Sequence, residues 1–345
     1  MPMTTLADLA ARAGVSVTTV SRALRDMPDI GVATKLRIRQ LADELGYRPN
    51  HAARALASNR SQIIGLGMET RSNPYFEELG LGVVRAAREL GWRTLLVEVR
   101  EDPQTGRPRL ELPAAGLIDG VLLFEGWYSR PFDAGQLHAL EQSGVKVLFR
   151  GTPAAPDIDH VQIDWQEGAY QATRYLLDLR HRRIGVLRGV GSEAEVESGR
   201  RHDKLAGTEQ ALSEAGLALD PSLVRVFPSR LAAARTAALE VLDQPARPTA
   251  LICHDDVLAL GALRAATELG LRVPTDLSIV GFNDTEIGRY LPVALTTVGF
   301  EIAPVARELV RLLIDRVEGR REPASLRSTE RLRLIVREST GPAPA

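Results

Sequence analysis

The sequence predicts a small all-α helix-turn-helix head followed by a two-lobed α/β body with doubly wound parallel sheets. Three observations predict this fold class. Residues 5–45 carry three helical patterns with a tight turn between the first two, and from Ser61 onward short apolar runs alternate with amphipathic stretches. That alternation occurs twice, which favours two lobes. A chain of 345 residues can form two or three domains with cores of their own.

The first two helices of the head are indicated by the residues at their starts. Thr5 and Asp8 fit a capping box, in which a hydroxyl and a carboxylate three residues later satisfy the free amides of a helix start. Gly14 supplies a tight turn, and Ser16 can cap a second helix over residues 17–24.

The exposed start of that second helix carries groups that can read DNA. Val17 can contact a thymine methyl group, Thr18 a phosphate or base edge, and Arg22 the acceptors of guanine. Residues 1–60 hold nine Lys/Arg and five Asp/Glu, a net charge of +4, which leaves −5 for the rest of a chain whose total is −1. A basic head on a mildly acidic body fits a protein that meets DNA at one end.

A third helix is predicted over residues 33–45, and Gly46 ends it in the left-handed conformation. Its core-facing positions are Leu36, Ile38, Leu41, Ala42 and Leu45.

Residues 49–60 are predicted to form a hinge. Asn50 can cap a helix over 51–58, shorter than the ~12–15 residues at which isolated helices become marginal in water. We therefore expect this helix only when DNA and a second copy hold it. Leu56 either packs on the core of the head or enters a base step from the minor groove as a wedge.

Eight apolar runs in the body are typical of buried parallel strands. They are residues 63–68, 94–99, 120–124, 145–149, 184–187, 223–227, 250–253 and 277–282, and a last strand is predicted at 332–336. The predicted helices are 77–90, 167–179, 204–215, 231–242 and 256–269. Ligands of such sheets bind outside the carboxyl ends of the strands, so we expect a binding cleft where the two lobes face each other.

Composition and motifs argue against several other classes of protein. The single Cys253 excludes a disulfide framework and indicates a reducing compartment. No apolar run reaches ~18 residues and no signal peptide is apparent, so a cytoplasmic location is expected. Gly65 and Gly67 suggest a dinucleotide fingerprint, but Thr70 replaces its third glycine. No metal, P-loop or nucleophile motif is present, so neither an enzyme nor a cofactor is predicted.

Several short motifs, in this order, carry a resemblance to a known family. In the head and hinge they are Thr5–Ala10, Gly14–Ser16, Thr19–Arg22, Gly46–Asn50 and Ala55-Leu56. In the body they are Ser72–Phe76, His181–Ile184, Gly261–Leu263, Val280–Phe282 and Leu295–Val298. Over essentially its full length the chain resembles the LacI/GalR family of bacterial transcription repressors.

The resemblance implies a homodimer whose paired heads bind a pseudo-palindromic DNA operator and whose hinge helices enter its centre. A small molecule in the cleft of a periplasmic-binding-protein-like body would shift the lobes and so change DNA affinity. The implied domains are a DNA-binding head (1–48), a hinge helix (49–60) and an effector-binding and dimerisation body (61–345). The N-lobe is expected at about 61–163 and 294–325, the C-lobe at about 164–293 and 326–340, and dimer contacts near 74–90 and 301–317.

The resemblance also assigns roles to single residues. Val17, Thr18 and Arg22 would contact bases, and Leu56 the minor groove. The backbone contacts would be Thr5, Ser16, Thr19, Ser21, Thr34 and Asn50. The effector contacts would be Asn73, Tyr75, Phe76, Arg150, Asp164, Trp165, Lys204, Asp255 and Asn283. The polar groups in this set can instead cap helices, Asp256 beside them above all, and Phe76 can be a core residue.

Departures from the family pattern bear on the effector. Lys204 replaces an arginine typical of the ligand site, Asp255 an asparagine and Asn283 an aspartate, and Trp165 stands where small or polar residues are frequent. Gly31 replaces a capping Ser or Thr in the head, and Arg180 replaces a common glycine. A neutral or cationic polyol, such as a sugar, is the expected effector.

Two other classes of protein share part of this pattern. A periplasmic small-molecule receptor shares the fold of the body, but it would need a signal peptide and would not carry residues 5–60. A nucleoid-architecture protein without operator specificity could use the head and hinge, yet it has no need of a body of ~280 residues.

Overall fold

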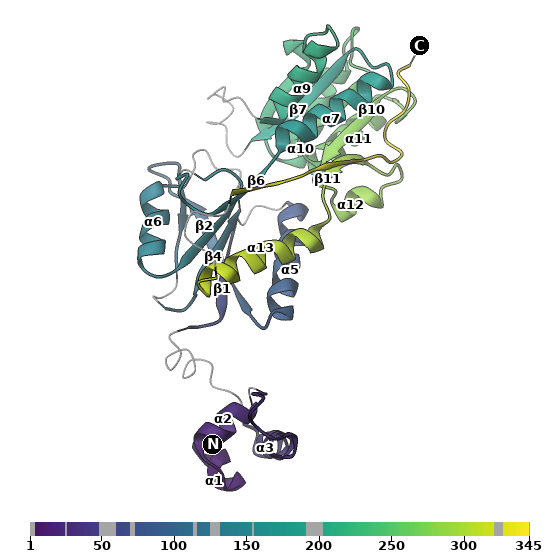
Figure 1. Cartoon of the computed structure of the whole chain (residues 1–345). Coiled ribbons are helices and arrows are strands. Elements are labelled where there is room, and N and C mark those ends of the chain that lie inside the picture. Colours follow the sequence, from purple (N-terminus) through teal and green to yellow (C-terminus); the bar gives the residue numbers. More distant parts are fainter. Residues whose placement is uncertain are drawn as a thin grey trace. The chain divides into compact units, whose positions relative to one another are not determined.

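The structure is a computed structural model that describes residues 4–24, 26–47, 60–69, 73–112, 116–124, 132–153, 155–190, 203–320 and 327–344. The predicted hinge helix, with Asn50 and Leu56, lies outside these residues. The chain divides into two compact units, Met1–Ser61, which holds the head, and Gln62–Ala345, which is the body (Figure 1).

The head consists of α1 (Leu6–Ala13), α2 (Val17–Leu24) and α3 (Val32–Glu44). Both halves of the predicted capping box are confirmed, since the Thr5 Oγ1 accepts from the Asp8 N–H and an Asp8 carboxylate oxygen accepts from the Thr5 N–H. Gly14 ends α1 at φ +66°, and the Ser16 Oγ accepts from the Thr19 N–H at 3.1 Å. The turn and both helix starts therefore follow from local sequence.

Leu9, Val20 and Ile38 are fully buried at the centre of the head and join its three helices. The prediction that Leu36 faces this core is wrong, because its side chain is 61% exposed. Leu36 lies two positions before Ile38, about 200° around the helix, so both cannot face the same core.

The N-lobe is built on a seven-stranded sheet. In spatial order its strands are β12 (Arg327–Glu330), β6 (His160–Ile163), β5 (Lys146–Arg150), β4 (Gly120–Phe124), β1 (Ile63–Glu69), β2 (Arg93–Glu101) and β3 (Pro108–Leu110). All neighbours are parallel except β2 and β3. Successive residues of a strand point to opposite faces. Accordingly, Leu122 packs towards α5 (Pro74–Glu89) and α13 (Ile302–Val317), whereas Val121 packs towards α6 (Ala134–Gln142).

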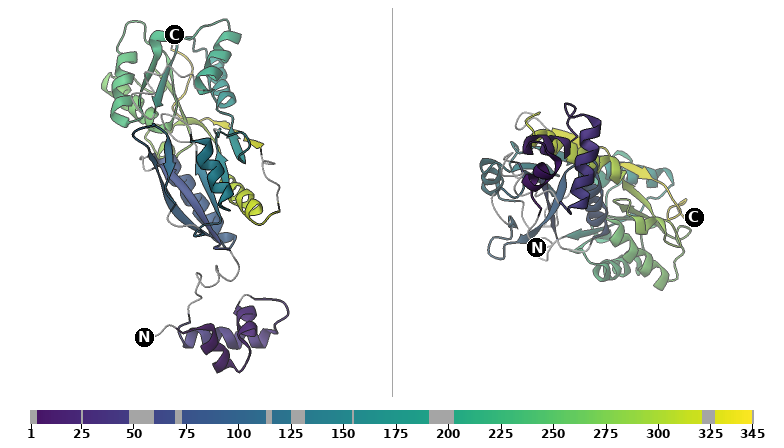
Figure 2. Two further views of the ribbon diagram at one scale, coloured as in Figure 1. Left: turned by 90° about the vertical axis from the view of Figure 1, so that its left-hand side faces the viewer. Right: turned by 90° about the horizontal axis from the view of Figure 1, so that it is seen from below.

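The C-lobe repeats this arrangement on a six-stranded sheet. Its strands are β13 (Arg333–Ile335), β11 (Thr296–Gly299), β10 (Ser278–Phe282), β9 (Ala250–Cys253), β7 (Ile184–Val190) and β8 (Val224–Pro228), the last preceded by the short 3-10 helix η1 (Pro221–Leu223). Helices α7 (Trp165–Asp178) and α9 (Asp203–Glu214) cover one face, and α10 (Leu231–Leu242) and α11 (Asp256–Glu268) the other. Figure 2 shows helices outside the sheet of each lobe.

The predicted strands and helices of the body are confirmed, and the fold class with them. One apolar core runs from the N-lobe into the C-lobe, since Leu79 of α5 and Phe282 of β10 belong to the same buried cluster. Within the described part of the chain, no helix combines the length and apolar character needed to cross a membrane.

The predicted lobe boundaries need two corrections. Residues 296–299 form β11 and pair with β10, so this segment belongs to the C-lobe and not to the N-lobe. Residues 327–330 form β12 and pair with β6, so this segment belongs to the N-lobe. The chain therefore passes between the lobes after β6, after β11 and after β12. The sequence of β12, Arg-Ser-Thr-Glu, has no apolar alternation that could have indicated a strand.

Arg180 stands at the end of α7, at a position where glycine is common in the family. Arg180 adopts φ +71°, and the N–H groups of Arg180 and His181 donate to the carbonyl oxygens of Leu177 and Leu176 at 3.0 and 3.1 Å. The helix end is thus intact, but a side chain occupies a left-handed position, which costs ~1–2 kcal/mol.

We predict that Arg180→Gly raises the free energy of unfolding by ~1 kcal/mol, because glycine adopts this conformation without steric cost. For a unit of this size, the melting temperature would rise by about 2 °C. Arg182→Gly is the control, since Arg182 is exposed and has no positive φ. An equal or larger gain from Arg182→Gly would contradict the explanation.

Candidate DNA-binding surface and effector site

The predicted base-reading residues lie on α2. Val17 and Thr18 are exposed at its start, where no described part of the head covers them. Arg22 lies in its last turn, and its Nη2 atom is 2.8 Å from the Asp29 Oδ1 in the loop that leads to α3. The head thus presents a small apolar group, a hydroxyl and a guanidinium from one helix.

The residues predicted to contact the DNA backbone also have roles within the head. The Ser16 and Thr19 hydroxyls are 2.9 Å apart and hydrogen-bonded, and Thr5 is engaged in the capping box. Ser21 and Thr34 are half-buried.

A first group of predicted effector residues gathers around Tyr75 at the start of α5. The Asn73 Oδ1 caps α5 by accepting from the Tyr75 N–H at 3.1 Å. The Tyr75 hydroxyl accepts a hydrogen bond from Arg150, and the Phe76 ring meets the Tyr75 ring edge-on at 4.9 Å between centroids. Arg150 is buried, lies 4.7 Å from the Phe300 ring centroid and donates through Nε to Glu330 at 3.0 Å. Arg150 is therefore held by protein groups on several sides.

A second group gathers around Lys204 in the first turn of α9. Lys204 is buried, and its Nζ atom lies 4.0 Å from the Trp165 ring centroid and 4.6 Å from the Phe282 ring centroid. The same atom donates to the His254 carbonyl oxygen at 2.6 Å. An ammonium between two aromatic faces is stabilised electrostatically. The ring of Trp165, first residue of α7, is placed by Asp164, which caps that helix by accepting from the Glu167 N–H at 3.0 Å.

The two adjacent aspartates have different hydrogen-bond partners. Asp255 is the cap of α11, since its Oδ1 accepts from the Leu258 N–H at 2.8 Å. The expectation that Asp256 is only a cap is wrong. Its Oδ2 accepts from the N–H and hydroxyl of Thr285 at 2.7 and 2.9 Å, and its Oδ1 from the Thr297 hydroxyl at 2.7 Å.

Burial raises the pKa of both carboxyl groups. It raises the pKa of Asp256 to about 7, against the hydrogen bonds from Thr297 and Thr285. For Asp255 the backbone N–H of Leu258 and the charge of Lys204 oppose the rise of the pKa. Gly281 is required beside Asp256, because a Cβ there would lie 2.3 Å from the Asp256 Oδ1.

The loop after β10 connects the candidate effector site to the N-lobe. Asn283 and Asp284 adopt φ +99° and +52°, and the Asp284 carboxylate is held by Arg289 at 2.7 Å and by Arg337. The next helix, α12 (Glu286–Arg289), has no cap from its own Thr285, whose hydroxyl donates to Asp256. Its first N–H, that of Glu286, instead donates to the Glu78 Oε1 of α5 at 2.9 Å.

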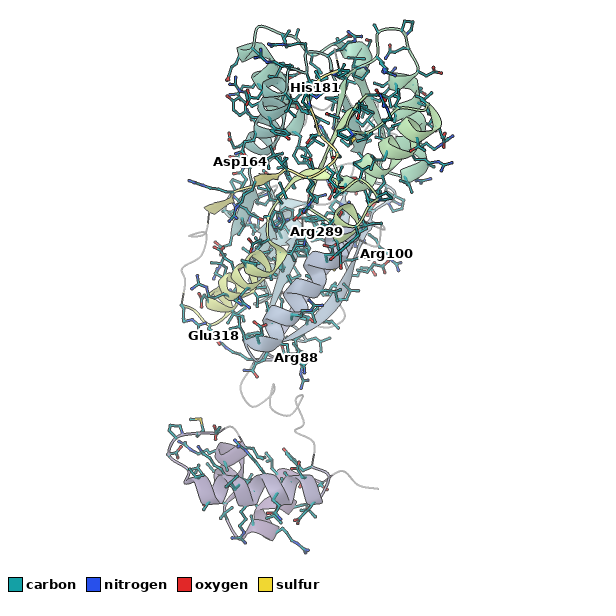
Figure 3. All side chains as sticks on the ribbon, turned by 90° about the vertical axis from the view of Figure 1, so that its right-hand side faces the viewer. Arg88, Arg100, Asp164, His181, Arg289 and Glu318 are labelled. Atoms are coloured by element: carbon teal, nitrogen blue, oxygen red, sulfur yellow. The ribbon has the colours of Figure 1, made fainter. Side chains whose placement is uncertain are left out.

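Glu78 therefore caps α12 from the other lobe. Figure 3 places Arg289 of α12 above α5, and Asp164 where the chain passes between the lobes. Burial raises the pKa of Glu78, which the hydrogen bond from Glu286 opposes. Phe282, Glu78 and Glu330 were not predicted as site residues. In the sequence, Phe282 is recognisable only as part of a buried strand. Glu78 and Glu330 could not be predicted, because their partners lie far away in sequence.

The fold defines a protein with a helix-turn-helix head and a two-lobed α/β body. Residues 5–50 match the family described as bacterial regulatory proteins, lacI family, and residues 173–340 match the periplasmic binding protein-like domain. The chain is 33% identical over 342 residues to the HTH-type transcriptional repressor CytR of Escherichia coli (strain K12), covering 99% of this chain and 97% of that protein. The chain belongs to the LacI family of transcriptional repressors.

Solved structures of similar fold agree with this assignment. The transcriptional regulator CelR in complex with cellobiose superimposes with a TM-score of 0.67 at 29% identity, over 97% of this chain and 99% of that one. The lac repressor dimer bound to operator and the anti-inducer ONPF gives 0.78 at 23% identity, over 99% and 100% of the two chains. The resemblance seen in the sequence is confirmed, and so is the prediction that the protein is a DNA-binding regulator and not an enzyme.

We predict that Glu78→Ala speeds hydrogen exchange of the Glu286 amide by at least about tenfold, because hydrogen bonds to charged groups contribute ~1.5–3 kcal/mol. Exchange measured by mass spectrometry on a peptide over residues 285–290 would report it. Glu77→Ala is the matched control, because Glu77 lies in the same helical turn and is exposed. Equal exchange in the two variants would show that Glu78 does not cap α12.

Proposed function

We propose that the protein is a homodimeric repressor of a pseudo-palindromic operator, whose DNA affinity is set by a sugar or related polyol bound between the lobes. The observation that carries this proposal is the exposed face of α2, with Val17, Thr18 and Arg22, on a lacI-type head joined to a two-lobed body. Under the proposal these three residues read bases, and Thr5, Ser16, Thr19, Ser21, Thr34 and Asn50 position the head on phosphates.

The aromatic and polar groups of the body support a sugar as the effector. Aromatic rings suit the apolar face of a pyranose, and the body carries Trp165 and Phe282 with centroids 6.3 Å apart. Asp255 and Asn283, both buried and located just after β9 and β10, supply a carboxylate and an amide that can bind hydroxyl groups. CelR, a relative in fold at 29% identity, binds a disaccharide, cellobiose.

The loop 283–286 supports a route from effector to DNA affinity. Asn283 begins this loop, and the Glu286 N–H at its end binds Glu78 in the other lobe. A ligand that contacts Asn283 acts on the same short segment that holds the lobes together. Because the coupling of two binding equilibria is reciprocal, operator binding changes effector affinity by the same factor.

An exposed apolar surface supports the homodimer. Leu81 and Val84 on α5 and Leu96 on β2 are 56%, 39% and 67% exposed, and exposed apolar groups of this size favour association. The exposed residues of α13 include Arg307, Glu308 and Arg311, and α13 itself packs on α5 (Figure 1). We therefore propose that α5 and β2 form the centre of the interface, and that α13 lies at its edge.

Leu81→Arg should convert the dimer to a monomer, because it places a charge in the centre of the proposed interface. Sedimentation velocity or light scattering of the full chain would measure the mass. Leu231→Arg is the control, since Leu231 is 51% exposed at the start of α10 in the C-lobe. A mass that Leu81→Arg leaves unchanged would place the interface elsewhere.

The proposed function is tested by binding of the full chain to the DNA upstream of its own gene, at fixed salt, with and without a panel of sugars, polyols and nucleosides. We expect a specific footprint that one sugar or polyol weakens or strengthens. Weak, salt-sensitive and sequence-blind binding without an effect of any compound would rule out an operator-specific, effector-gated repressor and favour a nucleoid-architecture role.

A further inference from the structure

A carboxylate lies beside the arginine that is proposed to read a base. The Arg22 Nη2 is 2.8 Å from the Asp29 Oδ1, and the side chains are 40% and 47% exposed. The guanidinium of Arg22 holds the pKa of Asp29 below its usual range, so the pair is charged on both sides at neutral pH. Arg22 lies on the same helix as Val17 and Thr18, and Asp29 lies in the loop between this helix and α3.

The backbone on both sides of the pair is fixed. The Met27 N–H donates to the Arg22 carbonyl oxygen at 3.1 Å, and the Ile30 N–H to the Met27 carbonyl oxygen at 3.2 Å. Ile30 packs against the head core, and Pro28 has a fixed φ. Asp29, between these two residues, therefore has a defined position relative to the last turn of α2.

The geometry leaves part of the guanidinium available. Arginine has five N–H donors in a planar fork, and Asp29 engages Nη2. Bidentate reading of guanine needs two donors held in one plane and aimed at O6 and N7. A carboxylate that fixes the plane of the fork reduces the freedom lost on binding, because fewer side-chain orientations remain to be excluded.

The negative charge of Asp29 also affects how Arg22 interacts with DNA phosphates. An unpaired arginine on this surface is attracted to any phosphate, and such contacts raise affinity for all DNA sequences alike. Pairing with Asp29 makes the site locally neutral, so less of its binding energy comes from phosphate charge and more from hydrogen bonds to a base. The carboxylate itself is repelled by the DNA backbone.

We propose that Asp29 is a positioning residue that fixes Arg22 for bidentate reading of a guanine and withholds it from the phosphates. This inference rests on the proposed function, in which Arg22 contacts a base. Asp29 acts through Arg22 and thereby sets how strictly one position of the operator is read.

The experiment is selection of duplexes with a randomised central segment by the full-length protein, followed by sequencing. Arg22→Ala identifies the base position that depends on Arg22. We expect Asp29→Ala to lower the preference for guanine there by roughly tenfold, to leave the other positions unchanged, and to tighten binding to random duplex. The double variant should lose no more guanine preference than Arg22→Ala alone.

Asp43→Asn is the control for charge, because Asp43 is exposed on α3 and its loss also removes one negative charge from the head. It should tighten random binding without changing any base preference. Guanine preference that survives in Asp29→Ala but is lost in Arg22→Ala would overturn the positioning role and keep the proposed function. Base preferences unchanged in Arg22→Ala would overturn Arg22 as a base reader. A uniform loss at all positions in Asp29→Ala would also overturn the positioning role, because Asp29 would then act on the whole head and not on Arg22.

Discussion

The arrangement of the body depends on one buried ion pair. Arg150 at the end of β5 and Glu330 at the end of β12 are 2% and 8% exposed, with Nη2 2.8 Å from the carboxylate. Burial raises the pKa of Glu330 and the charge of Arg150 opposes the rise, so each group makes burial of the other possible. The Glu330 carbonyl also accepts from the Asp164 N–H at 3.4 Å. The pair therefore fixes the point where two of the three connections between the lobes meet.

The candidate effector residues are arranged around that point on a shared apolar core. Tyr75 binds Arg150 directly, and Phe282, whose ring faces Lys204, belongs to the same buried cluster as Tyr75. Among the described residues between the lobes, buried charges and aromatic rings give rigid support, and the loop at Asn283 and Asp284 has a strained backbone. Strained backbone held by its surroundings is typical of segments that change conformation in function.

Much of the fold and part of the site could be predicted from the sequence. The helix starts at Thr5 and Ser16 and the apolar strands follow from local sequence patterns, and the structure confirms them. The predicted lobe boundaries were wrong, because β12 is polar and is identified only by its pairing with β6. The sequence favoured Asp256 as a helix cap, whereas Asp255 caps α11; both can cap a helix, and only the positions of Thr285 and Thr297 decide between them. Glu78 and Glu286 are 208 residues apart in the sequence, so local sequence patterns could not predict their contact.

The passage of the chain between the lobes also affects the order in which the protein is made. The head is closed by contacts within residues 4–47, so it can fold soon after it leaves the ribosome. The sheets of the body are completed by β12 and β13, which follow all the other described strands in the chain. Residues 337–344 continue along the C-lobe, where the Gly341 carbonyl binds the buried His181. During translation a finished helix-turn-helix head is therefore attached to a body in which neither lobe is complete.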